Sequence, residues 1–160
     1  MAQSLQSRKK VAKEVFVLFL LYTVLGISTE AIFTAVGDII RDQLDGKPFN
    51  WYLPCRTNLW VIPVYGVSAT VAFSFIGSFT PKFFRWPWWA RGLVYMFVIY
   101  GFEFMWALAI ESLLGIQVWD YRHSEYRVWR YINPQFCVFW FGFGFVLEWV
   151  KVKVLPRMLN

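Results

Sequence analysis

The sequence predicts an all-α fold, an integral membrane bundle of four transmembrane helices with both termini in the cytoplasm. Its 160 residues are 58% hydrophobic and only 16% charged. A soluble domain of this size exposes much of its surface and needs charge to stay dissolved, so this composition excludes an ordinary water-soluble protein. Each helical crossing takes roughly 20 residues, so four crossings with short loops fit, and we expect a single membrane domain over residues 1–160.

Four apolar stretches define the predicted crossings, at about 11–40, 59–79, 92–116 and 135–154. Helix breakers separate them, because Gly46 and Pro48 lie in the first loop and Pro81 ends the second stretch. Pro134 suits the first turn of the last helix. The tryptophans of the stretch Trp86–Trp89 suit the headgroup level of a bilayer, where indole rings are favoured.

Basic residues set the predicted orientation. Ten of the sixteen Lys and Arg residues lie in the N-terminal segment, the loop after the second crossing and the C-terminal segment, whereas six lie in the other two loops. The positive-inside rule therefore places both termini in the cytoplasm. Outside the apolar runs no basic and aromatic surface pattern occurs, so we predict no nucleic-acid partner. The residues do not distinguish a bacterial inner membrane from a eukaryotic internal or plasma membrane.

Two cysteines and one histidine limit the chemistry. Cys55 and Cys137 both fall toward the external side, as two free thiols or as a disulfide, a choice that spacing alone does not make. With only His123, which we expect to be solvated, a Cys/His zinc site is excluded. We expect no cofactor and no enzyme, because neither a nucleophile and base pair nor a metal-ligand spacing is visible.

Polar residues inside the crossings are the main indication of function, because a carboxylate in hydrocarbon costs roughly 2.5–3.5 kcal/mol on insertion scales. The first crossing carries a stripe of residues spaced by four, which should face protein: Tyr22, Gly26, Glu30, Thr34 and Asp38. The second carries a stripe of small residues that predicts close helix packing: Gly66, Thr70, Ser74 and Ser78.

The acids of the crossings differ in predicted depth. With ~1.5 Å of rise per residue, Glu30 and Glu111 fall in the external half of the bundle and Glu103 near its middle. We therefore expect an external vestibule lined by Glu30, Tyr65, Glu111, Asp120 and Asn133.

Two of the acids have expected ionic partners. Glu148 lies three residues before Lys151, so we predict a local ion pair there. Glu111 can serve the site or pair with Arg122 or Arg127 in the following loop.

Two other acids, Glu30 and Glu103, have no basic residue close to them within their own crossings. For these we favour a functional role over the alternative, a protonated carboxyl hydrogen-bonded to Tyr, Ser or Thr. Trp119 and Tyr121, in the loop after the third crossing, are interpreted as interfacial anchors, and Asp120 as a cap of that loop.

Several short motifs occur in a fixed order: Gly26–Glu30 with Phe33 and Thr34, Pro63–Gly66, Glu103 with Glu111, Trp119–Tyr121, then Asn133 and Trp140–Gly142. This ordered combination, over about residues 15–149, resembles the CmpB-like family, which is labelled ABC-transporter type IV and includes the animal transmembrane protein 229 group. The resemblance implies a small multi-pass membrane protein with recurrent polar positions at Glu30, Tyr65, Glu103, Glu111, Asp120 and Asn133. It implies no known activity.

Two functions remain open. The first is binding or moving a cation, proton or small cationic solute through an intramembrane carboxylate site, since carboxylates suit hard cations and proton relays. The second is a non-catalytic structural or assembly subunit of a larger membrane complex, because the 22% aromatic content exceeds what four short helices bury. Expected partners are the lipid bilayer and other membrane subunits or a separate ATPase, since the chain has no phosphate-binding GxxxxGK[ST] loop.

Overall fold

The computed structural model describes residues 2–79, 82–122 and 124–159. Within this part of the chain the fold is all-α, with one isolated bridge between Val128 and Ile132 as its sole extended pairing. Pro81 and His123 lie outside the described residues, so their predicted roles are not tested.

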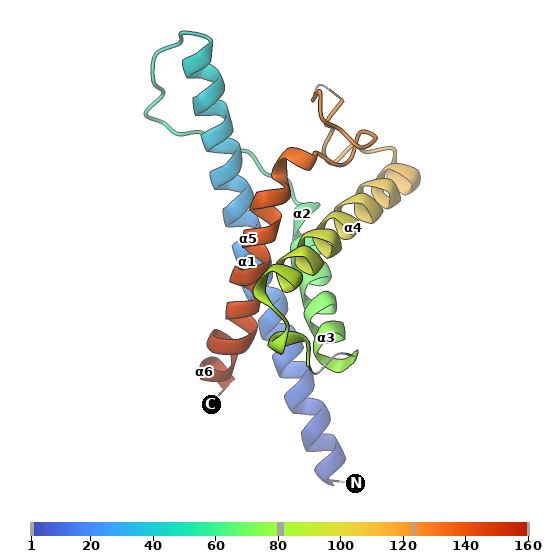
Figure 1. Ribbon diagram of the computed structural model, residues 1–160. Coiled ribbons are helices and arrows are strands. Elements are labelled where there is room, and N and C mark those ends of the chain that lie inside the picture. Colours follow the sequence, from blue (N-terminus) through green and yellow to red (C-terminus); the bar gives the residue numbers. More distant parts are fainter. Residues whose placement is uncertain (1, 80–81, 123, 160) are drawn as a thin grey trace.

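Four helical segments follow one another through the described residues (Figure 1). In chain order their elements are α1 (Ala2–Leu44); α2 (Val61–Pro63), the π-helix η1 (Val64–Ser68) and α3 (Ala69–Phe79); then, after the 3-10 turn η2 (Phe83–Arg85), α4 (Trp88–Leu114); and finally the 3-10 turn η3 (Pro134–Phe136), α5 (Cys137–Trp149), the π-helix η4 (Val150–Val154) and α6 (Leu155–Leu159).

The helices extend beyond some of the predicted crossings. The first helix was predicted over 11–40 and spans Ala2–Leu44, because the polar residues on both sides of the apolar stretch are also helical. Two stretches are long and apolar enough to cross a membrane, Arg8–Leu44 and Trp88–Leu114, and Val61–Ile76 is a shorter apolar helix. Helix α4 ends at Gly115, whose left-handed backbone (φ 67°) lets its amide donate to the Glu111 carbonyl at 2.9 Å.

Glycine lets α1 approach the second helical segment closely. A Cβ atom on Gly26 would lie 2.1 Å from Cγ of Tyr65, and one on Gly66 would lie 2.2 Å from Oγ1 of Thr23. The small-residue stripe of the second crossing therefore packs against α1 at Gly66. A side chain at either glycine would force the two backbones apart, and Tyr65 would move with them.

The last segment packs against both α4 and α1. A Cβ atom on Gly144 would lie 2.2 Å from Cβ of Tyr95, so α5 and α4 also meet at a glycine. Tyr22 of α1 is fully buried, and its hydroxyl donates to the Leu147 carbonyl at 3.1 Å. These contacts join three segments around one aromatic core.

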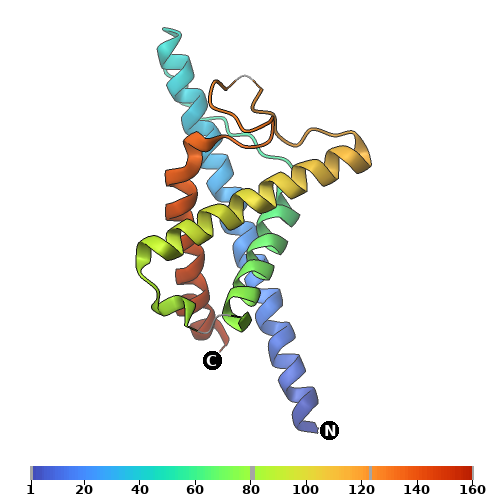
Figure 2. The same cartoon turned by 45° about the vertical axis from the view of Figure 1, so that its right-hand side comes forward.

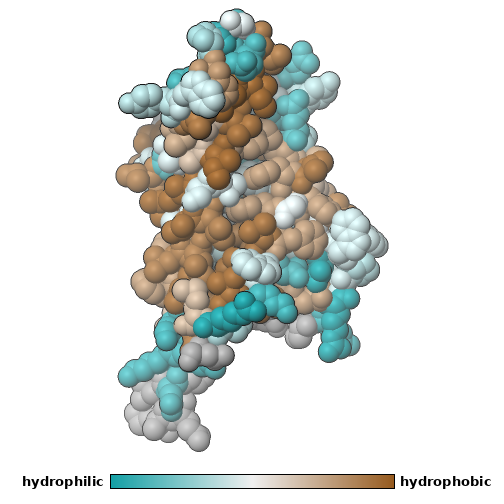
Figure 3. Space-filling model, turned by 90° about the vertical axis from the view of Figure 1, so that its left-hand side faces the viewer, coloured by the Kyte–Doolittle hydropathy of each residue, from teal (hydrophilic) through white to brown (hydrophobic). Residues whose placement is uncertain are grey.

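The two termini lie at one end of the bundle and the two long loops, 45–60 and 115–133, lie at the other (Figures 1 and 2). We call these the terminal end and the loop end. Helix α4 runs obliquely across the other helices in both views. On the face shown in Figure 3, hydrophobic residues form a belt between more polar ends, as expected for a protein surrounded by lipid.

Charge is distributed differently at the two ends. Ion pairs at the loop end take up five of its six basic residues: Arg41 and Arg56 with Asp38, Lys47 with Asp42 and Asp45, Arg122 with Asp120, and Arg130 with Glu111. At the terminal end, the described residues contain one ion pair, between Arg91 and Glu148. Cys55 and Cys137 are free thiols, so the two are not bridged.

Candidate functional site

Two carboxylates from different helices meet in one cavity toward the loop end. The cavity has a volume of about 230 Å³ and is lined by Glu30 of α1, Tyr65 of η1 and Glu103 of α4. Of the six residues predicted as a site, the structure brings these three together. The arrangement follows from the stripe of α1, because Glu30 stands one helical turn beyond Gly26, where α1 contacts Tyr65.

The carboxyl groups of the cavity have few internal partners. Glu103 is 8% exposed, and within the described residues neither Glu30 nor Glu103 forms an ion pair with a basic side chain. The Oε2 atom of Glu30 is buried and has no hydrogen-bond partner. Buried polar atoms are normally satisfied, so this oxygen lacks the hydrogen bond that a buried acceptor usually has.

Aromatic rings form most of the remaining cavity wall. They are Phe33, Trp119, Tyr121, Phe136, Phe139 and Trp140. The rings also pack on one another: the Phe33 and Phe136 centroids are 4.8 Å apart in an edge-to-face arrangement, and those of Phe139 and Trp140 are 4.9 Å apart. These contacts between rings hold the aromatic side chains of the wall in place without a ligand.

The loop 115–133 contributes two of these rings and is held in place by its own hydrogen bonds. The indole N–H of Trp119 donates to the Tyr131 carbonyl at 3.0 Å, and the Tyr121 amide donates to the Arg130 carbonyl at 2.8 Å. Burial raises the pKa of the Tyr121 phenol, and the nearby carboxylates of Glu103 and Glu30 raise it further. Tyr121 therefore presents a neutral ring to the cavity.

The sequence did not predict that Trp119 and Tyr121 line the cavity. Their positions beside a helix end favoured an interfacial anchor, whereas both side chains line the internal cavity. The one sequence feature that could have indicated this role is that both residues flank Asp120 in the loop after a helix that contains two glutamates. Only the folded loop, however, shows that they turn inward.

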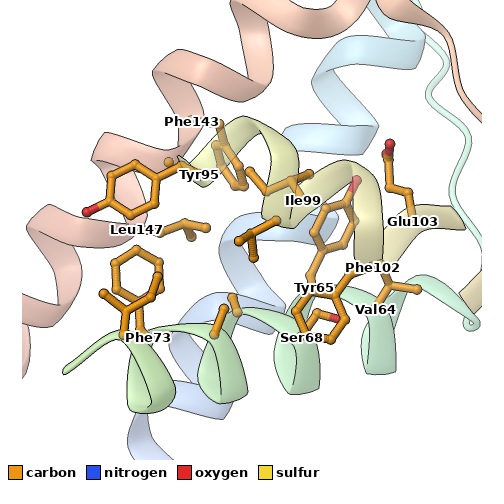
Figure 4. Close-up of a pocket in the computed structure, with 15 residues that line it drawn as sticks. Val64, Tyr65, Ser68, Phe73, Tyr95, Ile99, Phe102, Glu103, Phe143 and Leu147 are labelled. Atoms are coloured by element: carbon orange, nitrogen blue, oxygen red, sulfur yellow. The ribbon is translucent and has the colours of Figure 1, made fainter. Parts of the chain in front are cut away.

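A second, narrower cavity of about 40 Å³ adjoins the first. The two share Val64, Tyr65 and Glu103, while the second is otherwise lined mainly by apolar side chains. Figure 4 shows the Tyr65 hydroxyl and the Glu103 carboxyl directed to the same side, away from Phe73 and Leu147. Tyr65 thus stands between the carboxylate cavity and an apolar crevice that leads toward the terminal end.

A buried ion pair lies beyond this crevice, near the terminal end. Arg91 of α4 and Glu148 of α5 are 3.1 Å apart, and the Tyr95 hydroxyl donates to Glu148 at 2.5 Å. The prediction that Glu148 pairs with Lys151 is therefore wrong. The close α4 and α5 contact at Gly144 brings Arg91 within reach instead.

The three other predicted site residues have local partners away from the cavity. Glu111 accepts a hydrogen bond from Tyr131 and pairs with Arg130 at 2.5 Å, so the expectation of Arg122 or Arg127 as its partner is wrong. The fold of the loop brings Arg130 back over the end of α4.

Asp120 and Asn133 hold the ends of the loop. Asp120 accepts from the Arg122 amide at 2.9 Å and pairs with its guanidinium, which agrees with the predicted capping role. Asn133 accepts from the Gln135 amide at 3.0 Å and so caps η3, while its carbonyl accepts from Tyr100 at 2.9 Å. Both residues stabilise the loop that presents Trp119 and Tyr121.

The cavity offers two carboxyl groups and aromatic faces but few ligands for a metal ion. The described residues contain no group of three or more His, Cys, Asp or Glu side chains that could hold one. In their ionised form, the two carboxyl groups would attract a positive charge in a region of low dielectric constant.

The described part of the chain is an all-α fold with two long apolar helices that could cross a membrane, and it encloses a cavity lined by two carboxyl groups. The chain belongs to the family described as "Putative ABC-transporter type IV", whose model matches residues 17–160. The match confirms the resemblance to the CmpB-like family. No solved structure matches this chain.

Proposed function

We propose that this protein binds or moves a cation, a proton or a small cationic solute, and that Glu30 and Glu103 supply the negative charge. One observation carries the proposal: two carboxyl groups from separate helices line one cavity without a basic partner among the described residues. Removing carboxylates from water is costly, so a fold that gathers two of them must neutralise them with protons or with a bound cation.

The surroundings of the cavity support a role in transport. Loop residues Trp119 and Tyr121 cover it on one side, and on the other side Tyr65 separates it from the apolar crevice. A solute held at Glu30 and Glu103 is thereby shielded from the terminal end. Exchange between the two ends would require Tyr65 and its neighbours to move, as in alternating access.

The proposal includes four membrane crossings with both termini in the cytoplasm. It is supported by the shared location of the termini and by the concentration of basic residues at that end. The family description suggests a transporter assembly, and a separate ATPase subunit would supply any coupling to ATP. The proposed role is binding or transport and does not involve catalysis.

The test compares three Glu→Gln variants in lipid nanodiscs. Binding of KCl, NaCl and tetramethylammonium chloride is measured calorimetrically at constant ionic strength, and proton uptake with a pH-sensitive dye in proteoliposomes. We expect at least one cation to bind, and Glu30→Gln and Glu103→Gln each to weaken it about tenfold or more, because each removes one nearby negative charge.

Glu125→Gln is the matched control, since Glu125 is exposed in the loop 115–133 and lies outside the cavity. It should bind as the unmodified protein does. Absence of any cation or proton response, or an equal loss in all three variants, would refute the proposal.

A further inference from the structure

We infer that the cavity recognises an organic ammonium ion that carries methyl groups, of the size of tetramethylammonium or choline. The inference rests on the proposed function, because it names the class of cation that binds at Glu30 and Glu103. It follows from the composition of the wall, the state of the buried polar atoms, the shortage of metal ligands and the size of the cavity.

The wall is built mainly of aromatic faces. Seven of the thirteen lining residues are Phe, Tyr or Trp, and they come from three helical segments and the loop 115–133. The negative face of an aromatic ring attracts a cation, most strongly for Trp, and cages of such rings bind methylated ammonium groups. Methyl groups also contact rings favourably, so this wall suits a cation with an apolar surface better than a hydrated metal ion.

One buried polar atom of the cavity residues lacks a partner. Oε2 of Glu30 is a buried acceptor without a hydrogen bond, whereas the indole of Trp140, on a side chain that is 6% exposed, interacts with the Glu103 carboxyl group. A buried acceptor costs free energy while it is unsatisfied. The hydroxyl of a choline-like ligand can donate to the Glu30 carboxylate, while its ammonium group is attracted by the negative charge.

A metal ion finds too few oxygens here. Calcium takes about six to eight oxygen ligands and magnesium demands a near-octahedral set, whereas the cavity offers two carboxyl groups amid apolar rings. The hydroxyl of Thr34, which also lines it, is already bonded to the Arg56 backbone at 2.9 Å. A quaternary ammonium ion requires no coordinating oxygen, because its charge is spread over its methyl groups.

The volume also suits a small ligand. At roughly 30 Å³ per water molecule, about 230 Å³ holds seven to eight water-sized groups, which is similar to the number of non-hydrogen atoms in choline. Drug-sized ligands usually occupy pockets of about 300 Å³ or more. One monovalent cation balances one carboxylate, and a proton on the other carboxyl group would make the occupied site neutral.

The test uses the full chain in lipid nanodiscs and two variants of Tyr121. Both substitutions remove the hydroxyl group and leave an apolar side chain. Tyr121→Phe keeps the aromatic ring, whereas Tyr121→Leu removes it. Calorimetric titration with tetramethylammonium, choline, K⁺, Na⁺ and the neutral carbon analogue of choline gives the affinities. We expect tetramethylammonium and choline to bind more tightly than K⁺ or Na⁺, and the neutral analogue to bind at least tenfold more weakly than choline.

The ring itself should account for part of this affinity. Tyr121→Leu should weaken tetramethylammonium binding about tenfold relative to Tyr121→Phe, because only the Phe variant keeps an aromatic face. Two further variants of Trp119 provide an independent pair, since Trp119→Phe and Trp119→Leu lose the same hydrogen bond to Tyr131 and differ in the aromatic face.

The outcomes separate this inference from the proposed function. Binding of K⁺, Na⁺ or protons through Glu30 and Glu103 without binding of tetramethylammonium would overturn the inference and leave the proposed function standing. Equal binding of choline and its neutral analogue, or equal affinities of the Phe and Leu variants, would also overturn the inference. No binding of any cation or proton would overturn both.

Discussion

At the scale of single residues, the acids within the helices fall into two kinds that differ in their partners. Glu111 and Glu148 each have an arginine and a tyrosine within bonding distance. Glu30 and Glu103 have no basic partner in the described residues and share a cavity. The same residue type therefore stabilises contacts between elements in one place and lines a cavity in another.

The ion pair of Arg91 and Glu148 gives a direct test of the first kind. Both side chains are more than four-fifths buried, so Arg91→Met leaves Glu148 as an uncompensated charge and should lower the free energy of unfolding by about 3 kcal/mol. Adding Glu148→Gln removes that charge but keeps an acceptor for Tyr95, so most of the loss should be recovered. Reversible unfolding in mixed micelles measures both effects. Equal instability of the single and double variants would show that the charge is not the cause.

The sequence predicted which acids are internal but not which partners they have. The four-residue spacing on the first crossing correctly placed the Tyr22 to Asp38 stripe against protein, because helical periodicity alone decides which face a residue occupies. Arg91 with Glu148 and Arg130 with Glu111 join different elements. Their pairing depends on helix packing and loop conformation, which local spacing does not specify.

At the scale of elements, the contact between α1 and η1 determines the position of Tyr65. The π-helical turn is an uncommon conformation that often occurs at functional sites. Here it carries Val64 and Tyr65, two of the three residues that border both cavities. Small residues predicted close packing of this segment, and Gly66 confirms it. The wider turn itself was not predictable, because apolar periodicity does not distinguish it from an α-helix.

Two glycines of α1 allow this contact to be tested. Gly26→Ala places a methyl group 2.1 Å from Cγ of Tyr65 and should lower the free energy of unfolding by about 1–3 kcal/mol, with a parallel loss of cation binding. Gly37→Ala is the matched control, since nothing lies within 4 Å of its added methyl group, and it should stabilise the helix by up to about 1 kcal/mol. Unfolding in mixed micelles distinguishes them. The packing argument is wrong if the two substitutions have the same effect.

At the scale of the whole molecule, the described chain has two chemically different ends. The loop end carries most of the acidic residues and neutralises its basic residues in ion pairs, whereas the terminal end carries ten of the sixteen Lys and Arg residues. Composition and charge placement were sufficient to predict a helical membrane protein with its termini together. They could not locate the cavity, because its wall combines residues from four helical segments and a loop.

The orientation can be tested with single thiols. In the Cys137→Ser background, the exposed Cys55 of the first loop should react with a membrane-impermeant maleimide in intact cells, because the proposed orientation places the loop end outside. With both native cysteines changed to Ser, Arg85→Cys should react only after permeabilisation, since η2 lies at the terminal end. The reverse pattern of labelling would place the termini outside.

The unequal pairing of charge has a consequence for the lipid around the protein. At the terminal end Arg91 is engaged with Glu148, and the remaining basic side chains form no ion pair within the described residues. Each such side chain near an anionic membrane surface gains about 1 kcal/mol, so this end should gather a shell of acidic phospholipids in one leaflet. The opposite leaflet, facing side chains that already neutralise one another, should show no comparable enrichment, and the protein would carry an asymmetric lipid annulus with it.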